Sequence, residues 1–499
     1  MADTWSTPPV TASLENPLYY LENARTLISW VRQLHADLLT TEEVASLDGF
    51  LAAPTDVQAL LIRMVMRTQT LYRAQQLQHY AEINTPVTEL LQTLESLGLV
   101  ELEPKVASDQ LADLLNREEL LSVHNRFITK PLPKSAAKAR VKEALATQDL
   151  PSMSLANWLG TDAPSAALAC QPLFDRLRLM FFGNLRQSWS EFVVTELGYF
   201  NYETVELTES SRAFHQRVEV DQYLALNAIY EFSESLPLGE RIDLARAVQP
   251  INDWIGGRYA RLIFSLGQEA ERAGEIETAL ELYRTSGLGD ALIRELRVME
   301  KHVSPQAVQQ RLELATPRSL TPLHQLSIAR VEARVSKKLG ETKPAPKLRS
   351  PEEFKISIPR PEKCVELGTA EALGTPTAPI AYVENCLINS LFGLLFWDAL
   401  YAPVPGAFFH PFQSQPADLY RSGFKEKRRE QFDAAWARLN DGSYTEQIFE
   451  RFEQKRGITN AFIHWSIITP ELLALALKLI PAEHLHLIFE RLLSDIRTH

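Results

Sequence analysis

Apolar residues recur at the helical spacing of about 3.6 residues through most of the chain, beginning in its first 150 residues. The pattern predicts one amphipathic helix over Val57–Tyr72, on which Arg63 and Arg67 lie four residues apart and share a face. A second helix is expected from Ser108, as N-cap, to Arg126, and a third from Ser135 to Ala146.

The middle of the chain is also helical in pattern. The apolar and aromatic stretch Leu173–Tyr202 predicts buried helices that end at Gly198. Residues 260–293 match a helix-turn-helix repeat of about 34 residues, and the neighbouring segments 220–255 and 305–339 match it poorly. Such arrays bind partners or act as rigid spacers. The residues at the required offsets are Leu266, Gly267, Gly274, Ala279 and Tyr283.

Prolines interrupt the helical pattern between Lys337 and Pro379. The alternating segment Phe354–Ile358 could form an edge strand, because the prolines exclude a central one. After Tyr420 the helical pattern returns, and four helices are expected at Lys425–Leu439, Tyr444–Arg456, Pro470–Ile480 and Glu483–Arg497.

The segment Ala381–Tyr420 contains the most informative pattern. It predicts a nearly all-apolar helix with Glu384 in its first turn, then a Pro/Gly break and an aromatic-rich stretch carrying Gln413 and Asp418. A carboxylate held on a buried helix is suited to ligating a divalent cation. The alternative is that Glu384 complements the helix dipole, worth about 0.3–1 kcal/mol. For Gln413 the alternative is a turn residue that bonds its own backbone.

The composition limits the class of protein, the number of domains and the way in which nucleic acid could bind. With 45% hydrophobic and 23% charged residues, the chain is typical of soluble globular proteins, and 499 residues suggest about two to four domains. The net charge of −12 means that nucleic acid would have to bind through local basic patches. Three scattered cysteines argue against a disulfide framework, and we expect a cytoplasmic, nucleoid-associated protein with no membrane segment.

One stretch is locally basic. Between Arg126 and Lys142 there are six basic residues and no acidic one. They form either a solvated helix surface or a clamp for DNA phosphates, whose affinity would depend on salt. The six are Arg126, Lys130, Lys134, Lys138, Arg140 and Lys142.

Several enzyme classes lack their motifs here. The sequence contains no GxxxxGK[ST] loop, GxGxxG turn, HExxH pair or GxSxG elbow. Nucleotide hydrolases, dinucleotide enzymes, zinc peptidases and serine hydrolases are therefore disfavoured. His484 and His486 are two residues apart, so a helix would point them in different directions rather than at one metal.

The combination of these segments resembles the bacterial form of the Fanconi-associated nuclease family. The elements that carry the resemblance are Tyr19-Tyr20-Leu21, the Arg63/Arg67 helix, the basic SAP-like helix-linker-helix at about 108–147, LGYFNY, the helical repeats, and the YVEN…LFGLLFWD helix followed by FQSQPADLY. The last is the most specific.

The resemblance implies a mainly α multi-domain fold that ends in a restriction-endonuclease-like α/β domain called VRR-NUC, incomplete in this chain. The expected domains are 1–148 (helical, DNA-binding), 149–230 (helical core or linker), 231–340 (TPR-like repeats), 341–378 (proline-rich connection) and 379–499 (VRR-NUC, first part). It also implies a 5′-flap endonuclease with 5′-to-3′ exonuclease character, acting with Mg²⁺ or Mn²⁺ in repair of interstrand crosslinks.

The resemblance also implies site residues, which are matched by their positions in the family's motifs. Glu384 matches the family's first active-site glutamate and metal ligand, and Gln413 matches its active-site glutamine. Arg63 and Arg67 match DNA contacts, to which the basic segment adds Lys134, Lys138 and Arg140. Arg294 and Arg497 match residues that bind the 5′-phosphate, although basic residues late in helices are also common without ligands.

One departure leaves alternatives open. The family's Gly-Leu-Pro-Asp aspartate and later Glu-Val-Lys motif are absent from the 499 residues and would follow directly after them. A lone glutamate cannot hold a hard cation, which needs several oxygens. The expected function is therefore a flap nuclease whose sequence is cut short or a non-catalytic scaffold that binds DNA junctions, with a protein-interaction module as the third reading. The oligomeric state is open, a homo-oligomer on DNA included.

Overall fold

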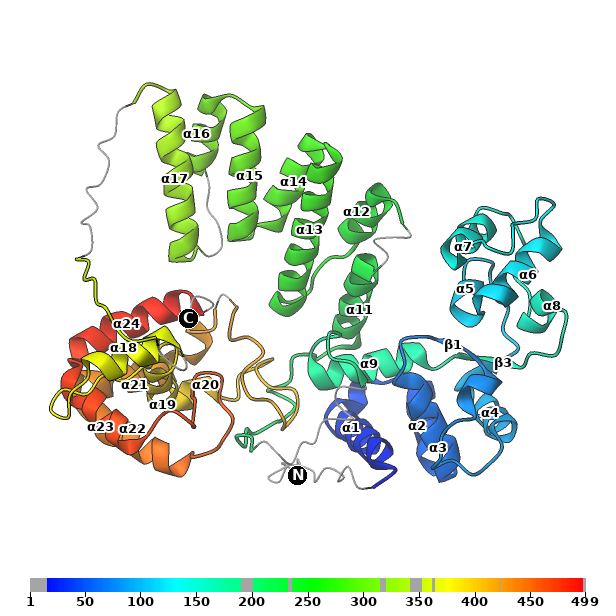
Figure 1. The fold of residues 1–499 in the computed structure, drawn as a ribbon, viewed down its shortest axis with the longest axis horizontal. Helices are drawn as coiled ribbons and strands as arrows, with labels where there is room; N and C mark the ends of the chain where they lie inside the picture. The colour runs from blue at the N-terminus through cyan, green and yellow to red at the C-terminus, as the bar shows by residue number, and fades with distance from the viewer. Residues whose placement is uncertain are drawn as a thin grey trace. The chain divides into compact units, whose positions relative to one another are not determined.

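The computed structural model describes residues 16–189, 201–231, 236–314, 320–341, 352–360, 364–421 and 423–496. These residues are predominantly helical, which confirms the predicted fold class (Figure 1). They group into two compact units. Unit 1 comprises Met1–Tyr199 and Leu207–Val220, and unit 2 comprises Phe200–Glu206 and Asp221–His499.

Unit 1 begins with helices that bury their apolar faces against one another. Helix α1 packs on α9 and α3, and the rings of Phe50 in α2 and Phe174 in α9 meet edge to face at 6.3 Å. A capping box between Thr40 and Glu43 sets the start of α2. The helices of this layer are α1 (Tyr19–His35), η1 (Ala36–Leu38), α2 (Thr41–Ala52), α3 (Thr55–Val65), α4 (Val87–Ser96) and α9 (Gln171–Phe182).

The predicted helix Val57–Tyr72 is too long. Helix α3 ends at Val65, and Leu71 and Tyr72 belong to strand β1 (Leu71–Arg73). The buried Tyr72 hydroxyl donates to the carbonyl oxygens of Met64, at the end of α3, and Gln69, in the turn that follows, at 2.6 and 2.5 Å. The Tyr72 hydroxyl thus binds the carbonyl of Met64, which would accept from a backbone amide if the helix continued.

A small antiparallel sheet, which the sequence pattern did not reveal, joins distant parts of unit 1. Its order is β1-β3-β2, with Tyr72 opposite Ala166 and Glu101 opposite Ala167. Each strand has three or four residues, too few for a readable alternation. The elements not yet bounded are η2 (Ala74–Leu77), β2 (Val100–Leu102) and β3 (Ser165–Leu168).

The basic segment forms a subdomain with its own core around the buried Trp158, whose indole N–H donates to the carbonyl of Val106 at 2.9 Å. The predicted helix Ser108–Arg126 is two helices, because Asn116 caps the second by accepting from the amides of Glu118 and Glu119. The next helix begins at Lys138 rather than Ser135. The helices are α5 (Leu111–Leu114), α6 (Arg117–Phe127), α7 (Lys138–Ala146) and α8 (Leu155–Leu159).

The stretch Leu173–Tyr202 is only partly covered by the described residues. Its buried helix α9 ends at Phe182, where Gly183 adopts a left-handed conformation with φ 67°. The predicted end at Gly198 lies outside the described residues.

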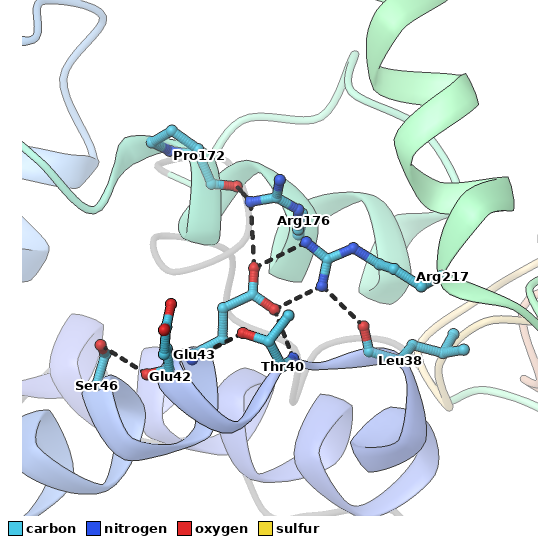
Figure 2. A network of polar contacts seen from close by, with 8 residues as sticks. All are labelled: Leu38, Thr40, Glu42, Glu43, Ser46, Pro172, Arg176 and Arg217. Atoms are coloured by element: carbon cyan, nitrogen blue, oxygen red, sulfur yellow. Dashed lines mark hydrogen bonds and ion pairs between the residues drawn. The ribbon is translucent and has the colours of Figure 1, made fainter.

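A partly buried carboxylate, that of Glu43, ties the returning segment Leu207–Val220 to the rest of unit 1 (Figure 2). Glu43 accepts from Arg217, in the first turn of α11 (Arg217–Glu231), at 2.6 and 3.0 Å, and forms an ion pair with Arg176 at 3.2 Å. Although burial opposes ionisation of Glu43, the bonds from Arg217 and the Thr40 amide keep its pKa below the ordinary value. The carboxylate therefore joins α2 and α9 to Arg217, which is still part of unit 1.

Unit 2 begins with the helical array, and the repeat predicted at 260–293 is present as α13 and α14. The turn between them is at Gly274, with φ 84°. A Cβ on Gly267 would lie 2.8 Å from Tyr283 Cε1, so only glycine permits this close packing. The array consists of α11, α12 (Leu238–Ala247), α13 (Asp253–Ala273), α14 (Ile276–Ser286), α15 (Gly289–His302), α16 (Pro305–Leu314) and α17 (Pro322–Lys338).

Two expectations for the connection 341–378 need correction. Residues 352–360, which include Phe354–Ile358, are described and form no strand, because their backbone has no paired neighbour. Residues Val365–Leu373 form a helix, α18, which the sequence analysis did not predict within the proline-rich connection. Its residues are mostly exposed, so the helical tendency of this short segment was not visible as a buried stripe.

The C-terminal part surrounds an aromatic cluster. Phe392 packs against Phe396, Phe462 and Phe489, with ring centroids 4.8, 4.9 and 5.7 Å away. The four helices predicted after Tyr420 are present with slightly different ends. The elements are α19 (Leu387–Leu395), α20 (Trp397–Leu400), η5 (Glu426–Arg428), α21 (Arg429–Asp441), α22 (Tyr444–Gln454), α23 (Pro470–Leu479) and α24 (Ala482–Ser494).

The α/β character expected for residues 379–499 is not seen in their described portion, which is helices and loops. The three-stranded sheet of the described chain lies in unit 1 instead. No single described helix is long and apolar enough to cross a membrane; α23 and α24 pass that test only as a pair, bent by 105° at their junction.

Candidate nucleic-acid and nuclease sites

Arg63 lies on the α3 face predicted to contact DNA, but it is bound within unit 1. Its Nε and Nη2 donate to Glu82 Oε1 at 2.9 and 2.5 Å, and its guanidinium carbon lies 3.9 Å from the ring centroid of Tyr20. Burial works against ionisation of Glu82, but its backbone bond and its bonds from Arg63 and Tyr20 hold its pKa below the ordinary value. A partner would have to compete with these contacts.

Arg67 differs from Arg63 despite the four-residue spacing. It follows the end of α3, and its side chain is exposed, with its guanidinium carbon 5.6 Å from the ring centroid of Tyr80. The two arginines thus both contact Tyr80, at 5.2 Å for Arg63, and only Arg67 is on the open surface. The sequence predicted that Arg63 and Arg67 share a helical face. In the structure they instead share a contact with the ring of Tyr80.

The SAP-like segment presents a more accessible basic surface. Lys134 precedes α7, and Lys138 and Arg140 lie in its first turn, all three exposed. Within the described chain, none of these three side chains forms an ion pair. The positive charge is therefore uncompensated, which is the arrangement that binds phosphate groups with release of counterions.

Glu384 lies three residues before α19, not in the first turn of a helix as predicted. Its exposed carboxylate accepts a 2.8 Å hydrogen bond from the Tyr382 hydroxyl, and this bond raises the pKa of Tyr382 to about 12. The next residue, Asn385, has φ 55°, a left-handed conformation that asparagine adopts more readily than most residues. The helix begins late because this turn precedes it.

Gln413 organises the loop that follows α20. Its amide nitrogen donates to the carbonyls of Ala407 and Gln415, both at 2.8 Å, and its oxygen accepts from the Phe409 amide at 3.0 Å. These contacts correspond to the backbone-bonding alternative. In the same loop, Asp418 forms a buried ion pair with Arg428, a partner that the sequence analysis did not identify.

Of the two expected 5′-phosphate ligands, Arg294 is described by the structure and Arg497 is not. Arg294 is half-exposed on α15 and donates to Glu271 at 2.7 and 2.9 Å, and Glu271 also accepts from the Tyr283 hydroxyl. Arg294 thus strengthens the packing of α13, α14 and α15. Arg497 lies outside the described residues.

A basic cluster that the sequence analysis missed lies inside unit 2. The guanidinium carbon of Arg421 lies 3.3 Å from the ring centroid of Trp254, and its charge interacts with the like charges of Arg258 and Arg261 in α13 and with the opposite charge of Asp418. Burial lowers the pKa of Arg421 to about 10, with Arg261 and Arg258 adding to the decrease. Arg258 in turn donates to Asn227 and lies over the Tyr223 ring. The three-residue spacing of Arg258 and Arg261 was the only sequence signal.

The acidic residues do not form a metal site in the described chain. No group of three or more His, Cys, Asp or Glu side chains lies within ligating distance among the described residues. Glu384 is held by a tyrosine rather than by a second carboxylate. A hard cation needs several oxygen ligands, so Glu384 alone does not fit one.

Comparison with known proteins decides the family. Residues 18–101, from the turn before α1 to β2, match the family model described as FAN1, HTH domain. A Fanconi-associated nuclease 1 homolog from Pseudomonas aeruginosa is 38% identical over 502 residues, covering 98% of this chain and 88% of that protein. The chain belongs to the Fanconi-associated nuclease 1 family. A homolog from Arabidopsis thaliana is 22% identical over 550 residues, covering 96% of this chain and 60% of that protein.

Solved structures of the family have the same fold. The crystal structure of paFAN1 bound to 5′-flap DNA with a 2-nucleotide flap and a gap has a TM-score of 0.81 and 38% identity, covering 97% of this chain and 89% of that one. A second complex, with a 1-nucleotide flap, has a TM-score of 0.79. Fanconi-associated nucleases are metal-dependent enzymes. The family resemblance expected from the sequence is therefore confirmed.

Proposed function

We propose that this chain is a structure-specific DNA nuclease that acts on 5′ flaps and related branched DNA, in repair of interstrand crosslinks. The observation that carries the proposal is its 38% identity, over nearly the whole chain, to a Fanconi-associated nuclease 1 homolog. The fold similarity to paFAN1 bound to 5′-flap DNA supports the same substrate class.

Two features of the chain support DNA binding. In unit 1, Lys134, Lys138, Arg140 and Arg67 would contact phosphates, because their charges are exposed. In unit 2, the cluster of Arg258, Arg261 and Arg421 would hold a single anionic group, such as the 5′-phosphate of a flap, because an anion would relieve the mutual repulsion that helps to lower the pKa of Arg421. Arg63 is a weaker candidate, since Glu82 already neutralises it. The family's 5′-phosphate ligands, Arg294 and Arg497, remain further proposals.

For catalysis, Glu384 is the proposed ligand for Mg²⁺ or Mn²⁺, and Gln413 is proposed to shape the loop beside it. The support for Glu384 is its motif position together with its exposure next to the left-handed Asn385. When bound, such a cation would activate water and stabilise charge on the phosphate. No group of three or more potential ligands lies together among the described residues, so Glu384 is proposed as one ligand of a site that needs several.

The direct test uses a 5′-phosphorylated flap labelled at its 3′ end. We would measure both binding and cleavage by the full chain in Mg²⁺, Mn²⁺ and EDTA. Metal-dependent cleavage that prefers the flap over a fully paired duplex supports the nuclease. Binding of both DNAs with equal affinity and no cleavage would refute it.

A second candidate is a scaffold that binds DNA junctions without cutting them. It is favoured by the absence of a metal-ligating group among the described residues. In the same experiment it would bind flap DNA more tightly than duplex in EDTA and in Mg²⁺ alike, and leave the strand intact.

A further inference from the structure

A cavity of about 620 Å³ opens in the helical array of unit 2, between α13, α14, α15 and α16, the neighbouring green helices of Figure 1. Its lining includes none of the residues assigned above to DNA binding or catalysis, although Arg258 and Arg261 belong to the same helix α13. Its volume is in the range of sites that bind small molecules or short peptide segments. The residues that decide its chemistry are Ile251, Leu288, Leu292, Arg284, Glu295 and Arg311.

A buried glutamate organises the polar side of this cavity. Glu295, at 0% exposure, accepts from Arg311 Nε and Nη2, both at 2.8 Å, and from Arg284 Nε at 2.7 Å. Burying a carboxylate is costly, and replacing such a buried pair by apolar residues is often neutral or stabilising. Stability alone therefore does not account for the arrangement. What it does is hold two guanidinium groups in fixed positions on the cavity wall.

The arginines keep donors for a ligand. Among the described residues, Arg284 uses only Nε and Arg311 uses Nε and Nη2 on Glu295, so both Nη atoms of Arg284 and Nη1 of Arg311 have no recorded partner. The Arg284 side chain is 51% exposed and that of Arg311 24%. With Asp253, which also lines the cavity, the charged lining residues are two arginines and two carboxylates, so the attraction for a ligand comes from these unused guanidinium donors rather than from an excess of positive charge. A carboxylate would gain charge-assisted hydrogen bonds there.

The other residues that line the cavity favour a peptide over nucleic acid as its ligand. Ile251 is 48% exposed at the rim, and Leu288 and Leu292 add aliphatic surface. Because Asp253 and Glu295 balance the charges of Arg284 and Arg311, the cavity lacks the excess positive charge that a chain of phosphates requires. One acidic group beside aliphatic side chains complements both parts of the wall.

We propose that this cavity binds a short acidic-aliphatic peptide segment of a partner protein, with a carboxylate on Arg284 and Arg311 and an aliphatic side chain against Ile251, Leu288 and Leu292. The concave surface of a helical repeat array is suited to such segments. This site is independent of the proposed nuclease activity, and its loss leaves that activity unchanged.

The experiment selects peptides from a phage-displayed random heptapeptide library on the full chain. We expect enriched sequences that place Asp or Glu next to Leu, Ile, Met or Phe. A fluorescein-labelled peptide of the most enriched sequence is then measured by anisotropy. Arg284→Gln should weaken its binding about tenfold or more, since a charge-assisted hydrogen bond is lost. Arg311 still covers both oxygens of Glu295 in this variant, so the fold is retained.

A second variant and a matched control complete the design. Ile251→Glu places a negative charge at a half-exposed rim position. It should weaken binding of the acidic peptide by a similar factor, because the two carboxylates repel each other. Arg297→Gln, an exposed arginine of α15 outside the cavity lining, should leave binding within about twofold. Selection of no consensus, selection of peptides without acidic residues, or equal binding by Arg284→Gln overturns the proposal. Competition by a 5′-phosphorylated oligothymidylate that Arg284→Gln abolishes would assign the cavity to nucleic acid instead.

Discussion

Arg428 and Asp418 form a fully buried ion pair in unit 2, in which Nη1 and Nη2 donate to the two carboxylate oxygens at 2.8 and 2.7 Å and the side chains are 0% and 2% exposed. The guanidinium also donates to the Phe424 carbonyl and lies over the Phe424 ring, 4.2 Å from its centroid. The pair therefore holds the loop that contains Gln413 against the start of α21.

Removing one partner of this pair should destabilise unit 2 strongly. We expect Arg428→Met to cost about 3–5 kcal/mol of unfolding free energy, because it leaves the Asp418 carboxylate buried without a countercharge. Urea unfolding measures this cost. The double variant Asp418→Leu with Arg428→Met should recover most of it. Equal loss in the single and double variants would mean that packing, rather than the unpaired charge, causes the effect.

Buried His35 makes unit 1 sensitive to acid. Burial, aided by the charge of Arg212, lowers the pKa of His35 from 6.5 to about 3. Between these values the unfolded chain binds a proton that the folded chain does not, so stability is lost as the pH falls below about 6.5, by about 2 kcal/mol at pH 5. Hydrogen exchange of peptides covering Tyr19–His35 should become faster in that window. His35→Leu should flatten the dependence, whereas His79→Gln, at an exposed position, should not.

The basic surface of the SAP-like segment should set the salt dependence of DNA binding. Replacing Lys134, Lys138 and Arg140 by Gln should flatten the slope of log affinity against log salt by about 2–3, close to 0.9 for each lost phosphate contact. Binding to duplex DNA from 50 to 200 mM salt, a range chosen from the general behaviour of such complexes, measures it. The control replaces the exposed Arg272, Arg297 and Lys301 of unit 2. A slope unchanged from the parent would make the segment an ordinary solvated surface.

Arg421 should distinguish flaps by their 5′ ends. If the cluster with Arg258 and Arg261 binds a terminal phosphate, the parent should bind a 5′-phosphorylated flap about tenfold more tightly than a 5′-hydroxyl flap, from one charge-assisted contact. Arg421→Gln should remove that preference. Competition binding in EDTA measures it without cleavage. Equal preference in parent and variant would leave the cluster as a structural contact with Trp254.

Glu384 should affect cleavage without affecting the fold. Its carboxylate is exposed and accepts one hydrogen bond, from the Tyr382 hydroxyl, so Glu384→Gln should change the melting temperature little. In a protein that cleaves flap DNA, the same change should abolish metal-dependent cleavage while flap binding in EDTA persists. Tyr382→Phe serves as the control for the hydrogen bond alone. Retained cleavage in Glu384→Gln would exclude this residue as a metal ligand.

The helices and their repeat were readable from the sequence because helical order is local. The repeat was recognised from residues that contact one another within a single helix pair, so their spacing in the sequence reflects the geometry of that pair. These residues are Leu266, Gly267, Gly274 and Tyr283. The motif around Glu384 likewise identified the family. The basic character of Lys134, Lys138 and Arg140 was visible because neighbours in sequence remain neighbours on one short surface segment.

Only the tertiary structure decided which charges are available and where helices stop. Arg63 and Arg67 look equivalent in sequence, yet Glu82 neutralises one and leaves the other exposed. Tyr72 leaves the predicted helix because its hydroxyl bonds back to the end of α3, and its strand depends on Ala166, ninety-four positions away. Ion pairs and strand pairs form between residues that are distant in sequence. A local sequence pattern therefore cannot identify the partner of a given residue.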